Sequence, residues 1–331
     1  MERFALAAAV VLGFALTAAL CSLFVPLRRV LERREQNQQP VQPEQPRPAP
    51  LRAPLWGGLC AAAGTVAAVG VGWLAACVGQ PELLGSEGRL MTRLLTALAG
   101  ALAFGAVGLA EDLARMRSPA ALGLRRDVRL LLEALAAAFV LLLLRAAGCL
   151  PRGLGVPGAG YVLLGSAVPF LWAVLMVALA ECARIAERDE GTVCGAAFVA
   201  MLALMMAEAG LGVPGLAVLP AALAGALVAL GLWAFPPARL GVGCCGSLLA
   251  AGAIGCIPLS LDMTSLTVPL ALPFWAAGGL LAAQLLGAKR TGKPLRCWVK
   301  KHKMSPETVF LCSFALSAVG YVLALALLRW C

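Results

Sequence analysis

Carboxylates are scarce in this sequence, and most of those that could do chemistry lie in two short stretches. Only 17 of the 331 residues are Asp or Glu. Glu111 and Asp112 stand side by side at the end of a long apolar run, and a second group follows near residue 185, comprising Glu181, Glu187, Asp189 and Glu190. Mg²⁺ prefers a few carboxylates, water and substrate phosphates as ligands, so both stretches are candidates for holding a metal-bound phosphorylated substrate.

A glycine-rich turn and a basic segment could complete such a site. Residues 239–247 read R-L-G-V-G-C-C-G-S, and residues 289–303 carry a run of Lys and Arg together with the only histidine, His302. Arg and Lys side chains bind phosphate oxygens. The alternative is that all these groups are ordinary solvated loop charges, because loops are where a membrane protein can place charge.

The composition predicts an all-α integral membrane protein. The chain is 61% hydrophobic and 13% charged, with a mean hydropathy of +0.88, whereas soluble domains carry roughly 25% charged residues. Helices are expected because apolar runs of about 20 residues span the hydrocarbon core. The net charge of +10 fits basic cytoplasmic loops better than nucleic acid, and no nucleic-acid partner is expected.

Ten membrane spans are predicted within one polytopic domain that covers residues 1–331. The loops between them alternate in charge, and nearly all the Lys and Arg residues that lie in loops belong to the odd-numbered loops. The positive-inside rule then places these loops, and with them the acidic stretches and the glycine-rich turn, in the cytoplasm, with both termini outside. A Pro/Gln-rich linker is expected at 35–54. The predicted spans are 4–26, 55–78, 90–110, 128–149, 162–182, 192–209, 217–235, 244–261, 266–287 and 308–329.

The cysteines give little sign of metal or redox chemistry. The chain has 12 cysteines without a C-x-x-C pair, and a single histidine, so zinc or haem ligation has little support. The adjacent Cys244 and Cys245 could form a redox or soft-metal site. They could equally be the result of evolutionary drift, and we favour drift because no second cysteine pair or histidine stands nearby.

Five sequence motifs, in order and at matching spacings, resemble one known family. They are A-P-L-W-G-G at 53–58, G-A-V-G-L-A-E-D-L-A-R at 105–115 followed by a Gly-Leu pair, the acidic stretch at 181–193, the turn at 235–252 and T-G-K at 291–293. The chain resembles the phospho-N-acetylmuramoyl-pentapeptide transferases (MraY), within the polyprenyl-phosphate N-acetylhexosamine-1-phosphate transferases of the glycosyltransferase family 4 type.

The resemblance implies a Mg²⁺-dependent phosphoryl transfer at the cytoplasmic face of the bacterial inner membrane. In that family, undecaprenyl phosphate attacks a UDP-linked MurNAc-pentapeptide to give the lipid-linked precursor of peptidoglycan. A homodimer is also implied. Carried onto this sequence, the family implies catalytic roles for Glu111, Asp112 and the position of Cys244, and metal ligation by Asp112 and Glu187. It implies substrate contacts for Glu187, Glu190, Arg184, Gly243, Ser247, Lys293 and His302.

The sequence departs from the family pattern at four places together. Glu111 replaces an aspartate, and Glu181 and Arg184 replace two asparagines. Cys244 stands where the family has a metal-binding aspartate, and a thiol is a soft ligand poorly suited to Mg²⁺. A histidine cluster expected in the ninth loop is missing, and His302 cannot be aligned with any one of its members.

Three functional hypotheses follow from these observations. The first is a divergent homologue with impaired or lost catalysis that serves as a binding, scaffold or regulatory protein. The second is an active transferase that uses Glu111, Asp112, Glu187 and Glu190 to hold the metal and is re-specialised for another UDP-sugar or another polyprenyl acceptor. The third is a channel or transporter, which rests only on the multi-span layout and is disfavoured by the lack of acids and amides near mid-span.

Overall fold

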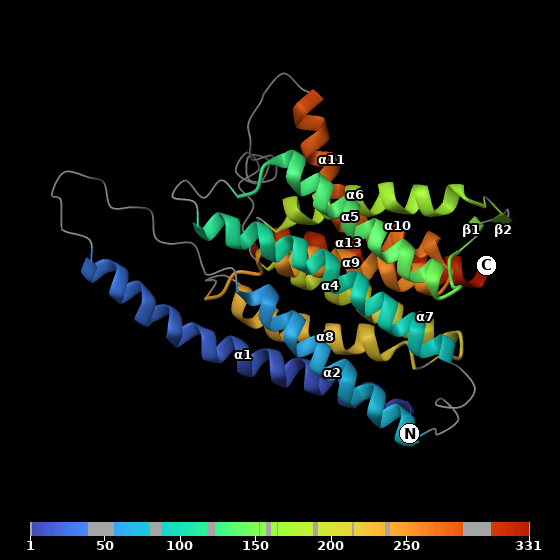
Figure 1. Ribbon diagram of the computed structural model, residues 1–331, viewed down its shortest axis with the longest axis horizontal. Helices are drawn as coiled ribbons and strands as arrows, with labels where there is room; N and C mark the ends of the chain where they lie inside the picture. Colours follow the sequence, from blue (N-terminus) through green and yellow to red (C-terminus); the bar gives the residue numbers. More distant parts are fainter. Residues whose placement is uncertain are drawn as a thin grey trace.

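The computed structural model describes residues 2–38, 56–79, 88–117, 123–151, 153–156, 160–163, 165–187, 191–213, 215–235, 239–286 and 306–330. These residues form a bundle of roughly antiparallel helices (Figure 1). The helices are α1 (Glu2–Gln38), α2 (Gly57–Gly79), α4 (Gly88–Arg117), α5 (Arg126–Ala146), α6 (Ala167–Ala186), α7 (Thr192–Gly210), α8 (Val218–Ala234), α9 (Gly243–Ser260), the 3₁₀ turn η1 (Thr264–Leu266), α10 (Thr267–Leu270), α11 (Leu272–Leu286) and α13 (Pro306–Trp330).

The helical membrane class is confirmed. Among the described residues, seven helices are long and apolar enough to cross a membrane, namely α1, α2, α4, α6, α7, α9 and α13. Three further helices are not among these seven. Helix α5 carries the charged residues Arg129, Glu133 and Arg145 along its length, and α8 and α11 are shorter, with 17 and 15 residues. A helix lies at each of the ten predicted segments, but ten membrane crossings remain a prediction.

Three segments differ from the sequence-based expectation. The predicted span 162–182 begins in a short antiparallel hairpin of β1 (Gly153–Val156) and β2 (Gly160–Leu163), with Gly153 opposite Leu163, and its helix starts only at Ala167. The span 266–287 is broken at Ala271 between α10 and α11, because proline interrupts the helical hydrogen-bond ladder and Pro269 and Pro273 flank this point. Helix α1 continues through residues 35–38 of the predicted linker, and residues 39–54 lie outside the described residues.

Helix α9 forms the centre of the bundle, and every one of its residues is buried. Glycines on its neighbours let the backbones approach closely. A Cβ added at Gly58 of α2 would collide with the backbone of Gly246, and one at Gly108 of α4 would collide with the carbonyl of Cys244. Small residues are how membrane helices pack without a hydrophobic driving force between them. The first turn of α9 is therefore held against α2 and α4 by backbone contact.

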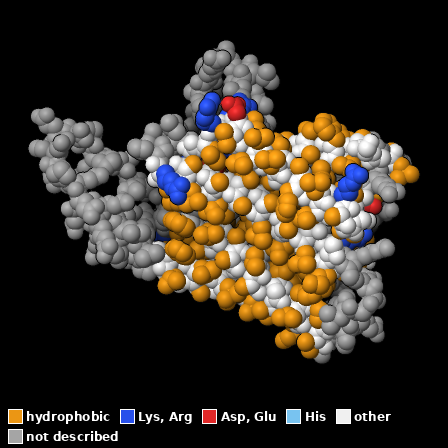
Figure 2. Space-filling model, viewed as in Figure 1, with side chains coloured by type: hydrophobic (Ala, Val, Ile, Leu, Met, Phe, Trp, Pro, Cys, Tyr) orange, Lys and Arg blue, Asp and Glu red, His pale blue; other side chains and the backbone are white. Residues whose placement is uncertain are grey.

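The two ends of the bundle differ in what they carry. The first residues of α1 and the last of α13 lie at the same end as the β1–β2 hairpin (Figure 1). At the opposite end meet the C-terminal ends of α4, α6 and α8 and the N-terminal ends of α5, α7 and α9. Figure 2 shows a mostly apolar face, with its visible charged side chains towards the margins. The expectation that both termini share one side agrees with this arrangement, whereas the absolute orientation in a membrane remains a prediction.

Candidate functional site

Eight charged side chains gather at the end of the bundle away from the termini. The last turns of α4 and α6, the first turns of α5 and the residue after α6 supply them. Helix α4 extends beyond its predicted end, so its acidic pair lies on regular helix, where residues three and four apart share a face. We call this set the charged cluster; it comprises Glu111, Asp112, Arg115, Arg129, Glu133, Glu181, Arg184 and Glu187.

Asp112 caps the N-terminus of α9. Its Oδ1 accepts a hydrogen bond from the backbone N–H of Cys244 at 3.0 Å, and its Oδ2 accepts one from Cys245 at 2.9 Å. Val242, the residue that precedes α9, makes no side-chain cap of its own. The first N–H groups of a helix have no partner within it, and a negative charge there is favoured by the helix dipole. Both oxygens of this buried carboxylate are thus engaged by the backbone.

Arg115 lies among three carboxylates. Its Nη2 donates to Glu111 Oε1 at 2.7 Å, and its Nη1 lies 3.8 Å from Asp112 Oδ1 and 3.7 Å from Glu187 Oε2. The Cys244 thiol also contacts Glu187, with Sγ 3.8 Å from Oε2. A guanidinium of the same protein therefore supplies part of the positive charge that offsets these three acids.

A second group of ion pairs joins α5 to α6. Glu181 accepts a hydrogen bond from Arg129 Nε at 2.7 Å on one oxygen and from Arg184 Nη2 at 2.6 Å on the other. Arg129 also lies 3.8 Å from Glu111 and 4.0 Å from Glu133, so it links the two halves of the charged cluster. Glu133 is completely buried, and its carboxylate oxygens have no hydrogen-bond partner among the described residues.

The donor set around Asp112 and Glu187 does not fit Mg²⁺ as it stands. The oxygens of Asp112 accept backbone N–H bonds, Arg115 lies near both carboxylates, and Cys244 offers a thiol. Mg²⁺ demands near-octahedral oxygen coordination and is poorly matched to a soft thiol ligand. The positive charge of Arg115 would also repel a cation placed between these carboxylates. Among the described residues, no group of three or more His, Cys, Asp or Glu side chains is placed to hold a metal ion.

Two other predicted site residues, Gly243 and Ser247, lie in the first turns of α9. Gly243 begins α9 with a φ of +71°, a conformation that favours glycine. Ser247 is fully buried, and its hydroxyl donates to the carbonyl of Cys244 at 3.1 Å, so in this conformation it supports the turn rather than facing an open site. Glu190, Lys293 and His302 lie outside the described residues.

Sequence reasoning missed the pairing of the arginines with the acids. Arg115 and Arg129 received no role, although each stands four positions from an acid on the same helix, which is a recognisable pair spacing. The contact between Arg129 and Glu181, 52 positions apart, has no comparable signal. Two further acids, Glu133 and Glu208, are buried within the protein.

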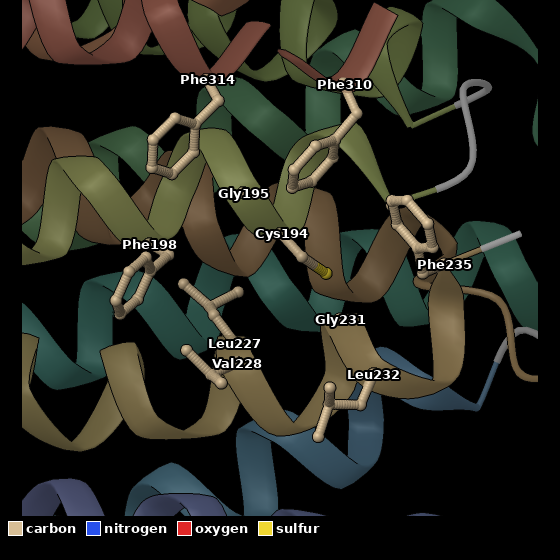
Figure 3. Close-up of a pocket in the computed structure, with 11 residues that line it drawn as sticks. Cys194, Gly195, Phe198, Leu227, Val228, Gly231, Leu232, Phe235, Phe310 and Phe314 are labelled. Atoms are coloured by element: carbon tan, nitrogen blue, oxygen red, sulfur yellow. The ribbon is translucent and has the colours of Figure 1, made fainter. Parts of the chain in front are cut away.

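An apolar cavity of about 370 Å³ lies between α7, α8 and the start of α13. Figure 3 shows Phe310 and Phe314 of α13 projecting towards α7, and the sulfur of Cys194 directed into the space. Phe310 packs edge-to-face on Phe235, with ring centroids 5.4 Å apart. We call it the phenylalanine cavity; its lining residues are Gly191, Cys194, Gly195, Phe198, Leu227, Val228, Gly231, Leu232, Phe235, Phe310 and Phe314.

The phenylalanine cavity opens near the same end of the bundle as the charged cluster. Gly191 precedes the first turn of α7, and Phe235 follows the last turn of α8. Glycines on the facing helices create the space, since a Cβ added at Gly195 would lie 2.7 Å from the ring of Phe310. The cavity therefore offers an apolar chain a place close to, but separate from, the charged side chains.

Comparison with known families gives one match. The model of the family described as glycosyl transferase family 4 matches residues 94–262, which is just over half of the chain. The matched range begins within α4 and ends just after α9, so it contains the entire charged cluster. No curated protein matches the chain significantly.

Proposed function

We propose that this chain, which belongs to glycosyl transferase family 4, is a membrane-embedded member of the family whose transferase activity is impaired or lost. The family includes MraY and related polyprenyl-phosphate hexosamine-1-phosphate transferases, and a membrane-embedded transferase family implies lipid-linked substrates. In this proposal the chain retains a binding, scaffold or regulatory role in a bacterial cytoplasmic membrane, with the charged cluster facing the cytoplasm. Its ligands are a polyprenyl phosphate and a UDP-linked sugar.

The position of Arg115 is the observation that supports this proposal most directly. Phosphoryl transfer depends on positioning and on neutralising developing charge, and the family resemblance assigns that task to Mg²⁺ held by carboxylates. Here Arg115 lies within 3.8 Å of Glu111, Asp112 and Glu187. The single guanidinium offsets part of the charge of the three carboxylates. It can donate hydrogen bonds to a phosphate, but it does not provide the octahedral coordination that a bound Mg²⁺ would.

The retained binding role is supported by the phenylalanine cavity. Its lining is apolar, and it lies beside the end of the bundle that carries the charged cluster. A polyprenyl chain could lie in it while its phosphate approaches the charged residues. Formation of a homodimer is part of the proposal only through the family resemblance.

A second candidate is an active transferase re-specialised for another UDP-sugar or another polyprenyl acceptor. It is favoured by the convergence of Glu111, Asp112 and Glu187 on a single point, although they come from two separate motifs. Under this reading Arg115 moves away when substrate and metal bind. Asp112→Asn and Glu187→Gln should then each abolish transfer.

The decisive experiment is a turnover assay on the purified, detergent-solubilised chain. Undecaprenyl phosphate, UDP-MurNAc-pentapeptide and Mg²⁺ are supplied, and UMP release and lipid product are measured beside an active family member. We expect no turnover, together with thermal stabilisation by the UDP-linked donor that does not depend on Mg²⁺. Turnover with this donor would refute the proposal. Turnover with a different UDP-sugar, lost in Asp112→Asn, would establish the second candidate instead.

A further inference from the structure

Glu181 is held by two arginines that come from different helices. Arg129 of α5 and Arg184 of α6 each bond one oxygen of its carboxylate, at 2.7 and 2.6 Å. The Arg129 and Arg184 side chains are 8% and 12% exposed, whereas that of Glu181 is 22% exposed. The two arginine side chains are thus more deeply buried than the carboxylate that they bind.

Two guanidinium groups converging on one anion is a geometry that suits phosphate as well as carboxylate. Both anions present oxygens at which guanidinium N–H groups form short, charge-assisted hydrogen bonds. The arginine pair also has unused capacity, since the buried Nε of Arg184 has no hydrogen-bond partner among the described residues. A buried donor left without an acceptor is costly, and a larger anion with more oxygens could satisfy it.

We propose that Arg129 and Arg184 form an oxyanion site for a phosphate or diphosphate group, and that Glu181 is an internal anion which occupies it. The inference rests on the proposed function, because it concerns the same end of the bundle, and it adds that an anionic ligand must compete with Glu181 there. An incoming phosphate must displace Glu181 from both arginines. Glu181 therefore lowers the affinity of this chain for anionic ligands.

Removing the charge of Glu181 should open the site without dismantling it. Arg129 keeps Glu111 and Glu133 within 4.0 Å, so its position does not depend on Glu181 alone. Arg184 has its only described ion pair with Glu181, so it becomes available to an added anion. The substitution Glu181→Gln preserves the shape of the side chain and leaves an amide that competes poorly with phosphate.

The test measures binding of pyrophosphate to the full chain in detergent by isothermal titration calorimetry, without Mg²⁺. Glu181→Gln should bind pyrophosphate at least about 10-fold more tightly than the unaltered chain. The matched control is Glu307→Gln, which makes the same change in charge at an exposed position in the first turn of α13. Equal gains in the two variants would show a general charge effect and overturn the inference.

Two further arms of the experiment locate the site and identify the source of the phosphate. Adding Arg184→Gln to Glu181→Gln should abolish the gain, and a retained gain would also overturn the inference. UDP and, in nanodiscs, a polyprenyl phosphate are titrated separately, so that preference for one distinguishes a nucleotide from a lipid headgroup. Circular dichroism and thermal unfolding verify that each variant is folded. Because pyrophosphate binding requires no turnover, the outcome is independent of whether the chain proves to be an active transferase.

Discussion

Asp112→Ala should destabilise the protein strongly, because Asp112 supplies the N-terminal cap of the central helix. The side chain is 1% exposed, and its two oxygens accept the backbone N–H groups of Cys244 and Cys245. Leaving a buried donor without an acceptor costs about 1–3 kcal/mol, so the loss of two acceptors amounts to about 2–6 kcal/mol. The loss of negative charge at the N-terminus of α9 adds about 0.3–1 kcal/mol. Asp112→Asn retains one acceptor and should lose about half as much.

The assay is unfolding of the purified protein in mixed micelles by a denaturing detergent, followed by circular dichroism. Asp127→Ala provides the matched control, since Asp127 is 85% exposed and lies 4.0 Å from Arg125, and an exposed pair of this kind contributes at most about 1 kcal/mol. The reasoning is refuted if Asp112→Ala is as stable as the control. It is refuted as well if Mg²⁺ stabilises the unaltered chain but not Asp112→Asn, because Asp112 would then act as a metal ligand rather than a cap.

Three other substitutions probe the packing, the missing carboxylate and the cavity. Gly58→Ala forces a Cβ into the backbone of α9 and should cost at least about 1–3 kcal/mol, whereas Gly70→Ala meets no atom within 4 Å and should be nearly neutral or stabilising in the same unfolding assay. Cys244→Asp should lower the melting temperature, because it buries another negative charge. Mg²⁺ should raise the melting temperature of this variant more than that of the unaltered chain. Equal responses to Mg²⁺ would show that the carboxylate alone does not restore a metal site. Gly231→Leu should fill part of the phenylalanine cavity and reduce binding of polyprenyl phosphate several-fold, as measured by native mass spectrometry. Gly279→Leu is the control, because a Cβ added at Gly279 meets no atom within 4 Å. Equal binding by the two variants would place the lipid elsewhere.

The sequence is informative about the fold because hydrophobic runs and charged loops are local signals. A helix lies at every predicted segment, and the broken segment near Ala271 carries its own prolines. The β1–β2 hairpin was missed, because four-residue strands rich in glycine give too short a pattern to distinguish from a loop.

The sequence predicts where the candidate site lies in the fold, but it does not predict the ion pairs within the site. Alternation of the loops predicted that Glu111, Asp112 and Glu187 would lie at one end with Cys244, and contacts of 3.0–3.8 Å now connect these residues. Which cation neutralises the acids depends on side-chain conformations and on the packing of α5 against α6. A sequence pattern does not specify these, so the pairing of Arg115 and Arg129 with the acids was not predicted, and Arg184 was expected to contact substrate rather than Glu181.

The complete burial of α9 has a consequence for how the protein is assembled in the membrane. Its most apolar window has a mean hydropathy of 1.6, the lowest among the seven candidate spans, yet none of its surface is left for lipid. A translocon partitions each emerging segment into the membrane according to the hydrophobicity of that segment. The hydrophobicity of α9 is low for a membrane span, and the helix also contains Pro258. Its partners α2, α4 and α6 are synthesised earlier. We therefore expect α9 to enter the bilayer against helices already inserted, so that variants which loosen α2 or α4 should lower the yield of correctly inserted protein before they alter any ligand binding.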